Sequence, residues 1–147
     1  MAGYVYAPNA EVDSGEIEAI ESVARDYCES WYTGDAERMA RCLHREWDNL
    51  GLVNRVVDTR TQYIDTEHLT HSQQVQLTGT GAGVANPEDR TIEITVLTAK
   101  HHLASVKVVL KGMTDLLHLI RFPEGWRIVH TIWTLEGGVI ANATTDI

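Results

Sequence analysis

The second half of the chain constrains the fold most, because apolar and polar residues alternate there over consecutive segments. Residues 91–96 and 104–111 alternate with a period of two, and residues 115–122 and 126–133 are rich in leucine, isoleucine and tryptophan. Alternation of this kind is typical of strands whose two faces lie in different surroundings. Short turns, including a Pro-Glu-Gly sequence, join the segments. We therefore predict four consecutive strands in an antiparallel arrangement.

The first half of the chain carries helical signals instead. Asp13, with Glu16 three residues later, has the pattern of a capping box at the start of a helix. Apolar residues then follow at spacings of three or four, which is typical of one buried helix face. These apolar residues are Ile17, Ile20, Ala24, Tyr27 and Trp31. Gly34 ends this predicted helix, and Asp35 is positioned to cap a second, shorter one.

A third helix is expected over residues 67–76, with Asp65 or Thr66 as its N-cap. Helices and strands are thus segregated along the chain, which favours an α+β domain. We predict three N-terminal helices packed on a curved antiparallel sheet, which together enclose an internal pocket. The expected organisation is an arm at 1–13, one domain at 14–140 and a tail at 141–147.

Composition excludes several classes of partner. The 147 residues carry a formal net charge of -9, whereas nucleic-acid binding requires clustered lysine and arginine. The same charge disfavours an anionic membrane surface, and no apolar run is long enough to span a bilayer. Residues 1–15 lack the features of a signal peptide. Cys28 and Cys42 are expected to be buried thiols, so we expect a cytoplasmic protein.

Several short segments resemble the nuclear transport factor 2-like superfamily, and within it the family named Putative lumazine-binding. These segments are Trp-Tyr-Thr-Gly-Asp at 31–35, Leu-His at 43–44, Asp-Leu-Leu-His-Leu at 115–119 and Trp-Arg-Ile-Val-His at 126–130. The resemblance covers residues 14–136 and extends to SnoaL-type polyketide cyclases and ketosteroid isomerases. It implies a cone-shaped α+β fold and a homodimer formed through the outer face of the sheet. It does not specify the function, since the superfamily hosts isomerases, dehydratases, cyclases, hydrolases and binding proteins.

The ketosteroid isomerases offer a closer comparison of site residues. Their oxyanion hole uses a tyrosine seven residues before a Gly-Asp pair, and Tyr27 lies seven residues before Gly34. Their second donor, a protonated aspartate, lies three residues before an Arg-Phe pair, a position that His118 occupies here. The resemblance therefore implies that Tyr27 and His118 point into the pocket. The catalytic base of those enzymes falls on Gly51, which has no side chain to abstract a proton.

Strand parity then assigns the expected lining of the pocket. If His118 faces the lumen, Leu116 and Ile120 face it too, and Asp115 faces away. By the same register Thr131 and Trp133 line the pocket, whereas His130 points outward. Trp31 and Trp47 are further expected ligand contacts, because an aromatic face can stack on a planar molecule.

Other polar residues remain open to two interpretations. His44 either caps the last carbonyl groups of the second helix or lies at the mouth of the pocket beside Trp47 as a third catalytic group. His68 and His71 lie three apart, and His101 and His102 are adjacent in a turn. Neither pair has an identifiable third ligand, and catalytic zinc requires three. We expect no metal and no cofactor.

Three functions are consistent with these residues. The leading hypothesis is a cofactor-independent enzyme that uses acid–base chemistry on a small, largely apolar or aromatic oxygenated molecule, with Tyr27 and His118 as its main groups. Isomerase, dehydratase and hydrolase reactions are not separated. The alternative is a non-catalytic protein that binds a planar heterocycle or a similar metabolite, which Gly51 favours. A third hypothesis is an association domain whose pocket is filled by its own side chains.

Overall fold

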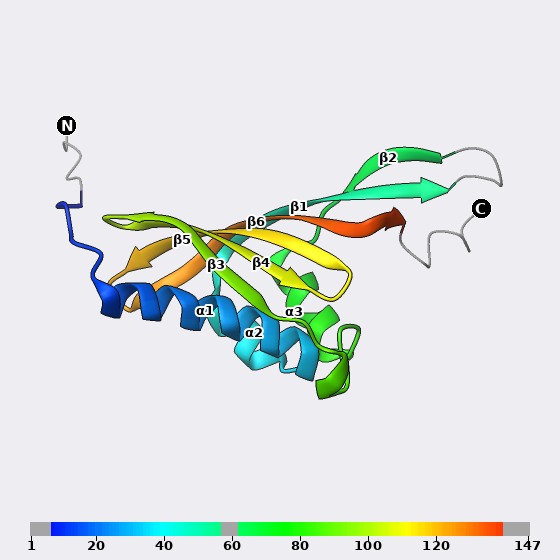
Figure 1. The fold of residues 1–147 in the computed structure, drawn as a ribbon, viewed down its shortest axis with the longest axis horizontal. Coiled ribbons are helices and arrows are strands. Elements are labelled where there is room, and N and C mark those ends of the chain that lie inside the picture. The colour runs from blue at the N-terminus through cyan, green and yellow to red at the C-terminus, as the bar shows by residue number, and fades with distance from the viewer. Residues whose placement is uncertain (1–6, 57–61, 140–147) are drawn as a thin grey trace.

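The computed structural model describes residues 7–56 and 62–139 (Figure 1). Within these ranges the chain forms three α-helices, one short 3-10 helix and six strands. In chain order they are α1 (Ser14–Thr33), α2 (Ala36–Cys42), β1 (Leu43–Val56), β2 (Gln62–Glu67), α3 (His71–Gly79), η1 (Pro87–Asp89), β3 (Glu93–Lys100), β4 (Leu103–Leu110), β5 (Met113–Phe122) and β6 (Gly125–Val139).

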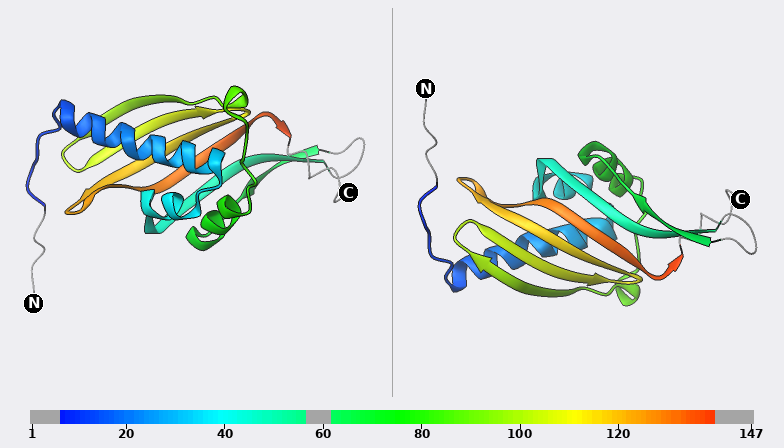
Figure 2. Two further views of the ribbon diagram at one scale, coloured as in Figure 1. Left: turned by 90° about the horizontal axis from the view of Figure 1, so that it is seen from below. Right: turned by 90° about the horizontal axis from the view of Figure 1, so that it is seen from above.

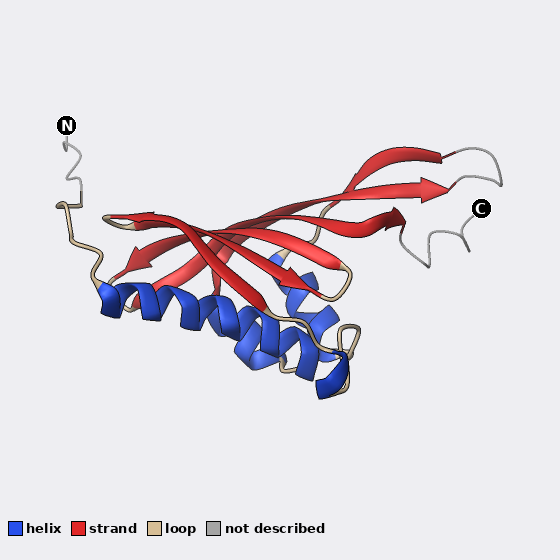
Figure 3. Cartoon of the chain, in the orientation of Figure 1, coloured by secondary structure: helices blue, strands red, loops and turns tan. Residues whose placement is uncertain are grey.

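All six strands belong to one curved sheet with the order β2-β1-β6-β5-β4-β3. Strands β3 to β6 form the antiparallel meander that the alternation predicts. Strand β1 pairs with β6 in parallel, so the complete sheet is mixed. The three helices lie on one face of the sheet, and α1 runs along it (Figures 1 and 3). The α+β prediction is confirmed, and we call the helix-covered face the inner face and the opposite face the outer face.

The predicted limits of the first helix and the predicted start of the second helix are confirmed. The Asp13 carboxylate accepts a hydrogen bond from the Glu16 backbone N–H at 2.9 Å, and Gly34 ends α1 in the left-handed conformation with φ of 73°. Asp35 caps α2 in the same way, through the Arg38 N–H. The Glu16 side chain does not close the predicted capping box. It reaches Arg121 at 3.0 Å instead, and this ion pair ties the first turn of α1 to β5.

The third helix begins later than the sequence analysis predicts. Residues 62–67 form strand β2, and α3 begins at His71 with Thr70 as its N-cap. Thr70 and Gln73 make both hydrogen bonds of a capping box. The prediction of Asp65 or Thr66 as the cap is therefore wrong, because these two residues pair with β1. The sequence analysis does not predict most of strand β1.

The core lies between α1 and the inner faces of β4, β5 and β6. Along α1, Ile20, Ala24 and Tyr27 are buried as predicted. The two cysteines, Cys28 and Cys42, are free and buried, and burial raises the pKa of the Cys28 thiol to about 12. Both are therefore inert buried thiols at neutral pH. No helix within residues 7–56 and 62–139 is long and apolar enough to cross a membrane.

Candidate functional site

A buried hydrogen bond between helix α1 and strand β5 forms the centre of the candidate site. The Tyr27 hydroxyl donates to Oδ2 of Asp115 across 2.6 Å. Tyr27 is only 6% exposed and Asp115 only 1%. The helix supplies Tyr27 because this residue lies on its apolar stripe, and β5 supplies Asp115 because the side chain points to the inner face. A carboxyl group among apolar core residues is costly to bury, so this one requires a specific explanation.

The second carboxyl oxygen of Asp115 lacks a partner. Its Oδ1 atom is buried and makes no hydrogen bond within the part of the chain that the structure describes. Burial raises the pKa of Asp115 to about 7, while the hydrogen bond from Tyr27 acts in the opposite direction. Burial, followed by the charge of Asp115, raises the pKa of Tyr27 well above its ordinary value. Tyr27 thus remains a donor, and Asp115 can exchange a proton near neutral pH.

The immediate neighbours of Asp115 in the sheet are apolar. Val108 on β4 and Trp133 on β6 are its partners across the two ladders. Trp133 is in turn paired with Gly51 on β1, and a Cβ atom at Gly51 would overlap the Trp133 indole ring. Glycine is therefore required at this position for the indole to lie against the strand. The indole of Trp133 thus lies directly against Gly51, the position that the sequence analysis aligned with the isomerase base.

Two further polar contacts lie inside the core, next to this row. The Trp47 indole N–H donates to Oγ1 of Thr131 at 3.0 Å, and both residues are buried. Asn49 binds both the carbonyl oxygen and the N–H of Leu69, which links β1 to the segment before α3. Trp47 and Thr131 thus occupy the inner side, as the sequence analysis predicts for them. Trp133 is the ladder partner of the inward-facing Asp115, and it also lines part of the groove on the opposite face. Their role in ligand binding stays a prediction.

His118 does not lie at the interior site. It is exposed on the outer face, where its ring stacks on that of His130 with 5.6 Å between centroids and 25° between planes. The prediction that His118 faces the lumen and Asp115 faces away is therefore wrong. Side chains alternate along a strand, so the burial of Asp115 and Leu117 places His118 on the opposite side.

The two neighbouring apolar residues of β5 that were expected to line the pocket also lie on the outer face. Leu116 and Ile120 share the outer face with His118 and are only partly buried there, so they do not line the interior. Leu116 instead lines an outer groove, together with Leu50, Gly51, Leu52, Thr66, Thr114, Ile132, Trp133 and Thr134. The prediction of His130 as an outward residue is confirmed by its stacking on His118.

The remaining predicted site residues are His44 and Trp31. His44 is the second residue of β1 and stacks on Phe122, at the β5–β6 turn, with 4.7 Å between ring centroids. It therefore does not cap α2, whose C-cap residue is Leu43. Its place at the mouth of a pocket stays a prediction. Trp31 packs against Gly83 in the loop after α3, where a Cβ atom would overlap its indole ring.

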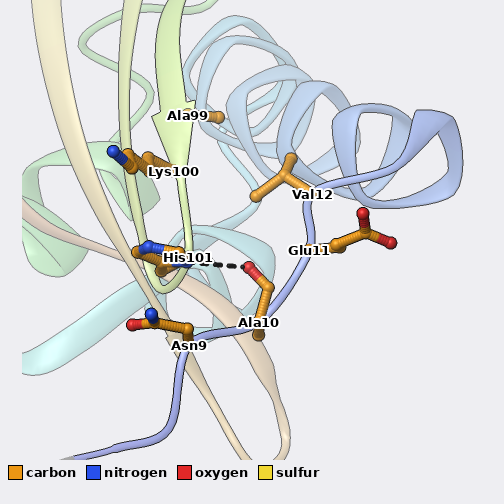
Figure 4. Close-up of a pocket in the computed structure, with 7 residues that line it drawn as sticks. All are labelled: Asn9, Ala10, Glu11, Val12, Ala99, Lys100 and His101. Atoms are coloured by element: carbon orange, nitrogen blue, oxygen red, sulfur yellow. Dashed lines mark hydrogen bonds between the residues drawn. The ribbon is translucent and has the colours of Figure 1, made fainter.

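A cavity lies between the segment before helix α1 and the β3–β4 turn. It has a volume of about 290 Å³ and is lined by residues 9–12 and 99–101 (Figure 4). His101 lies 3.1 Å from the carbonyl oxygen of Ala10, and His102 lies 2.8 Å from that of Pro8. These two histidines hold the entering segment against the β3–β4 turn. They are thus structural contacts.

The other histidine of interest pairs with a carboxylate. His68 lies 2.6 Å from Oδ1 of Asp48, on the outer side of the sheet. Asp48 is exposed, so it does not substitute for the missing base inside the core. Within the residues that the structure describes, no three histidine, cysteine, aspartate or glutamate side chains form a group that could hold a metal ion.

Comparisons with known proteins agree with this architecture. The family model described as Putative lumazine-binding matches residues 15–134. An NTF2-like protein of unknown function from Silicibacter pomeroyi is 14% identical, with a TM-score of 0.64, over 84% of this chain and 98% of the other. A ketosteroid isomerase-like protein from Erwinia carotovora is 13% identical, with a TM-score of 0.58, over 84% and 98%. A search of curated proteins finds no match.

The contact between Gly51 and Trp133 predicts an unusual response to substitution. Alanine normally stabilises a strand relative to glycine. Gly51→Ala should instead lower the free energy of unfolding by about 1–3 kcal/mol, because the new methyl group overlaps the indole ring. Urea denaturation measures this effect. In a Trp133→Leu background the penalty should largely disappear, and an equal penalty in both backgrounds would contradict the contact.

The raised pKa of Asp115 predicts how stability depends on pH. Because the folded-state pKa of about 7 lies above the unfolded value, the folded state binds more protons between pH 4 and 7. Stability should therefore fall as pH rises through this range, by on the order of 4 kcal/mol from this group. The Asp115→Asn variant should lack this component when its stability is measured by urea unfolding. It should also be more stable than the wild-type protein at pH 8.

The matched control for this experiment is Asp48→Asn, which removes an exposed carboxylate instead of a buried one. This control should keep the fall in stability between pH 4 and 7. If Asp115→Asn and the wild-type protein lost stability in parallel across the range, Asp115 would not be the titrating group.

Proposed function

Because the chain belongs to the Putative lumazine-binding family, within the NTF2-like superfamily, we propose that it binds a small oxygenated molecule and transforms it by cofactor-independent acid–base chemistry. The observation that carries this proposal is the buried Asp115 carboxyl group, which has one oxygen held by Tyr27 and the other unpartnered. The apolar core around it favours a largely apolar or aromatic ligand.

Asp115 supplies the proton in this proposal. When it is protonated, its free oxygen can donate to a carbonyl or hydroxyl oxygen of the ligand. Charge that develops on that oxygen is stabilised more strongly in a dry site than in water. Because the pKa of Asp115 is raised to about 7, both protonation states are accessible near neutral pH, as general acid–base catalysis requires. Isomerisation, dehydration and hydrolysis all use such a step.

Tyr27 acts on Asp115 rather than directly on the ligand in this proposal. Its hydroxyl holds Oδ2, which orients the carboxyl group and lowers its pKa toward neutrality. Trp133, the ladder neighbour of Asp115, provides an aromatic wall beside the acid. Asp115 therefore takes the role that the sequence analysis assigned to His118.

A non-catalytic binding protein is the second candidate. The observation that favours it is the packing of Trp133 against Gly51, which leaves no side chain at the position of the isomerase base. Such a protein would hold a planar heterocycle through Asp115 and return it unchanged. The two candidates share one site, so they differ only in whether the ligand is transformed.

We also propose that two copies of the chain associate through the outer face. Leu50, Leu52 and Ile132 are 45%, 47% and 42% exposed there, in a groove of about 400 Å³. None of the described residues that line this groove is charged, whereas the chain as a whole carries -9. Two copies would repel each other over an acidic surface, so a charge-free apolar face is the favourable place for contact.

A cytoplasmic location is part of the proposal. It is supported by two buried cysteines that remain free thiols, since such thiols are typical of reducing compartments.

The first experiment identifies the ligand and its fate. Native mass spectrometry of the purified protein, followed by denaturing release, gives the mass of any retained molecule. That molecule, together with a panel of planar aromatic ketones and enones, is then incubated with the protein and analysed for conversion. Conversion supports the enzyme, and recovery of unchanged ligand supports the binding protein.

Variants then test the assigned residues. Asp115→Asn should lower kcat/KM by a factor on the order of 100–1000, as expected for the loss of one positioned donor. Tyr27→Phe should shift the pH profile of kcat to higher pH, because it removes the hydrogen bond that lowers the pKa of Asp115. His118→Gln should leave turnover unchanged. Full activity of Asp115→Asn, or loss of activity in His118→Gln, would refute the assignment.

A further inference from the structure

The outer face of the sheet carries two histidines beside its apolar groove. His118 on β5 and His130 on β6 are direct cross-strand partners, and their rings stack at 5.6 Å. We call them the outer histidine pair. None of the three described α-helices covers this face in the view from above (Figure 2, right). The pair is therefore available to whatever binds there.

The pair is continuous with the groove. Leu116 and Ile132 line the groove and are cross-strand partners in the neighbouring row of the sheet. Each lies two residues from one histidine of the pair and points to the same face. Any second copy that covers Leu116 and Ile132 must therefore also approach the outer histidine pair.

We propose that the outer histidine pair makes self-association through this face dependent on pH, so that the neutral pair permits association and the protonated pair opposes it. This inference rests on the self-association proposed above, but not on the chemistry of Asp115. It gives a function to the histidines that the interior site does not use.

Two physical effects act in the same direction. Imidazole changes its charge between pH 5 and 8, and two stacked imidazolium rings repel each other at short distance. Covering a charged ring with an apolar surface also removes its hydration, which is unfavourable unless a partner charge compensates. Protonation of the pair therefore costs more in the associated state than in the free one. By linkage, association weakens as pH falls.

The charged neighbours of the outer histidine pair do not reverse the direction of this pH dependence. Asp48 on β1 is the ladder partner of His130, and its carboxylate is already engaged by His68. On the remaining adjacent strand, β4, the partner of His118 is the uncharged Ser105, and Lys107 in the next row adds positive charge. On β6, Arg127 also adds positive charge, with its guanidinium bound to the Arg41 carbonyl oxygen. Asp48 attracts the protonated form of His130, but this carboxylate is shared with His68. Two imidazolium rings whose centroids lie 5.6 Å apart repel each other directly.

Sedimentation velocity of the full chain tests this inference. The dissociation constant is measured from pH 8.0 to 5.5 at constant ionic strength, with EDTA present to prevent bridging by metal ions. We expect it to rise by about tenfold for each imidazole that must lose its proton on association. A dissociation constant that is independent of pH would overturn the inference.

Two variants assign the effect to the pair. The double variant His118→Gln, His130→Gln should still associate at pH 8.0 and should lose the pH dependence, because glutamine is polar but does not titrate. It retains Asp115, so titration of the interior site is the same in both proteins. His71→Gln, on helix α3, is the matched control and should keep the full dependence. Persistence of the dependence in the double variant would refute the role of the pair.

A third variant distinguishes the association surface from its proposed pH dependence. Ile132→Asp places a charge in the groove and should abolish association at every pH. If Ile132→Asp abolishes association but the wild-type protein shows no pH dependence, the association surface is supported and the role of the outer histidine pair is refuted. If Ile132→Asp still associates as the wild type does, or if the wild type is monomeric at pH 8.0, both the proposed association surface and its pH dependence are refuted.

Discussion

The hydrogen bond between Tyr27 and Asp115 is the contact on which the interior of this protein depends. It joins helix α1 to the middle of the sheet through two side chains that are almost completely buried. A carboxyl group in such a position is stable only if it is neutral or well solvated by protein dipoles. Tyr27 satisfies one oxygen, and a proton or a ligand must satisfy the other. The same energetic conflict raises the pKa of Asp115 and makes this residue suitable for acid–base chemistry.

Much of the fold follows from local patterns in the sequence. Capping residues fixed both ends of α1 and the start of α2, because Asp13, Gly34 and Asp35 satisfy backbone groups that a helix leaves open. Most of strand β1 could not be predicted from the sequence, for a physical reason. It pairs with β6 in parallel and with β2 over a long register, so its stability comes from distant partners rather than from a clear alternation of its own residues.

His118 was assigned to the wrong face because both faces of β5 carry large aliphatic residues, which leaves the alternation of this strand ambiguous. The preceding hairpin contained the missing information. Lys111 and Gly112 form a two-residue turn in which Leu110 pairs with Met113, so Asp115 pairs with Val108 and His118 pairs with Ser105. Since β4 alternates clearly between valines and polar residues, this register would have placed Asp115 inside and His118 outside. The resemblance to the isomerase motif supplied a residue position but not the direction of the side chain.

The most direct test of this account is the titration of Asp115 itself. The protein is labelled with ¹³C at aspartate carboxyl carbons, and their chemical shifts are followed by NMR from pH 3 to 9, with Asp115→Asn to assign the resonance. The account predicts one aspartate that titrates near pH 7 and is absent from the variant. If the Asp115 resonance titrated below pH 5 with the other aspartates, this carboxyl group would be ionised at neutral pH and could not serve as the proposed proton donor.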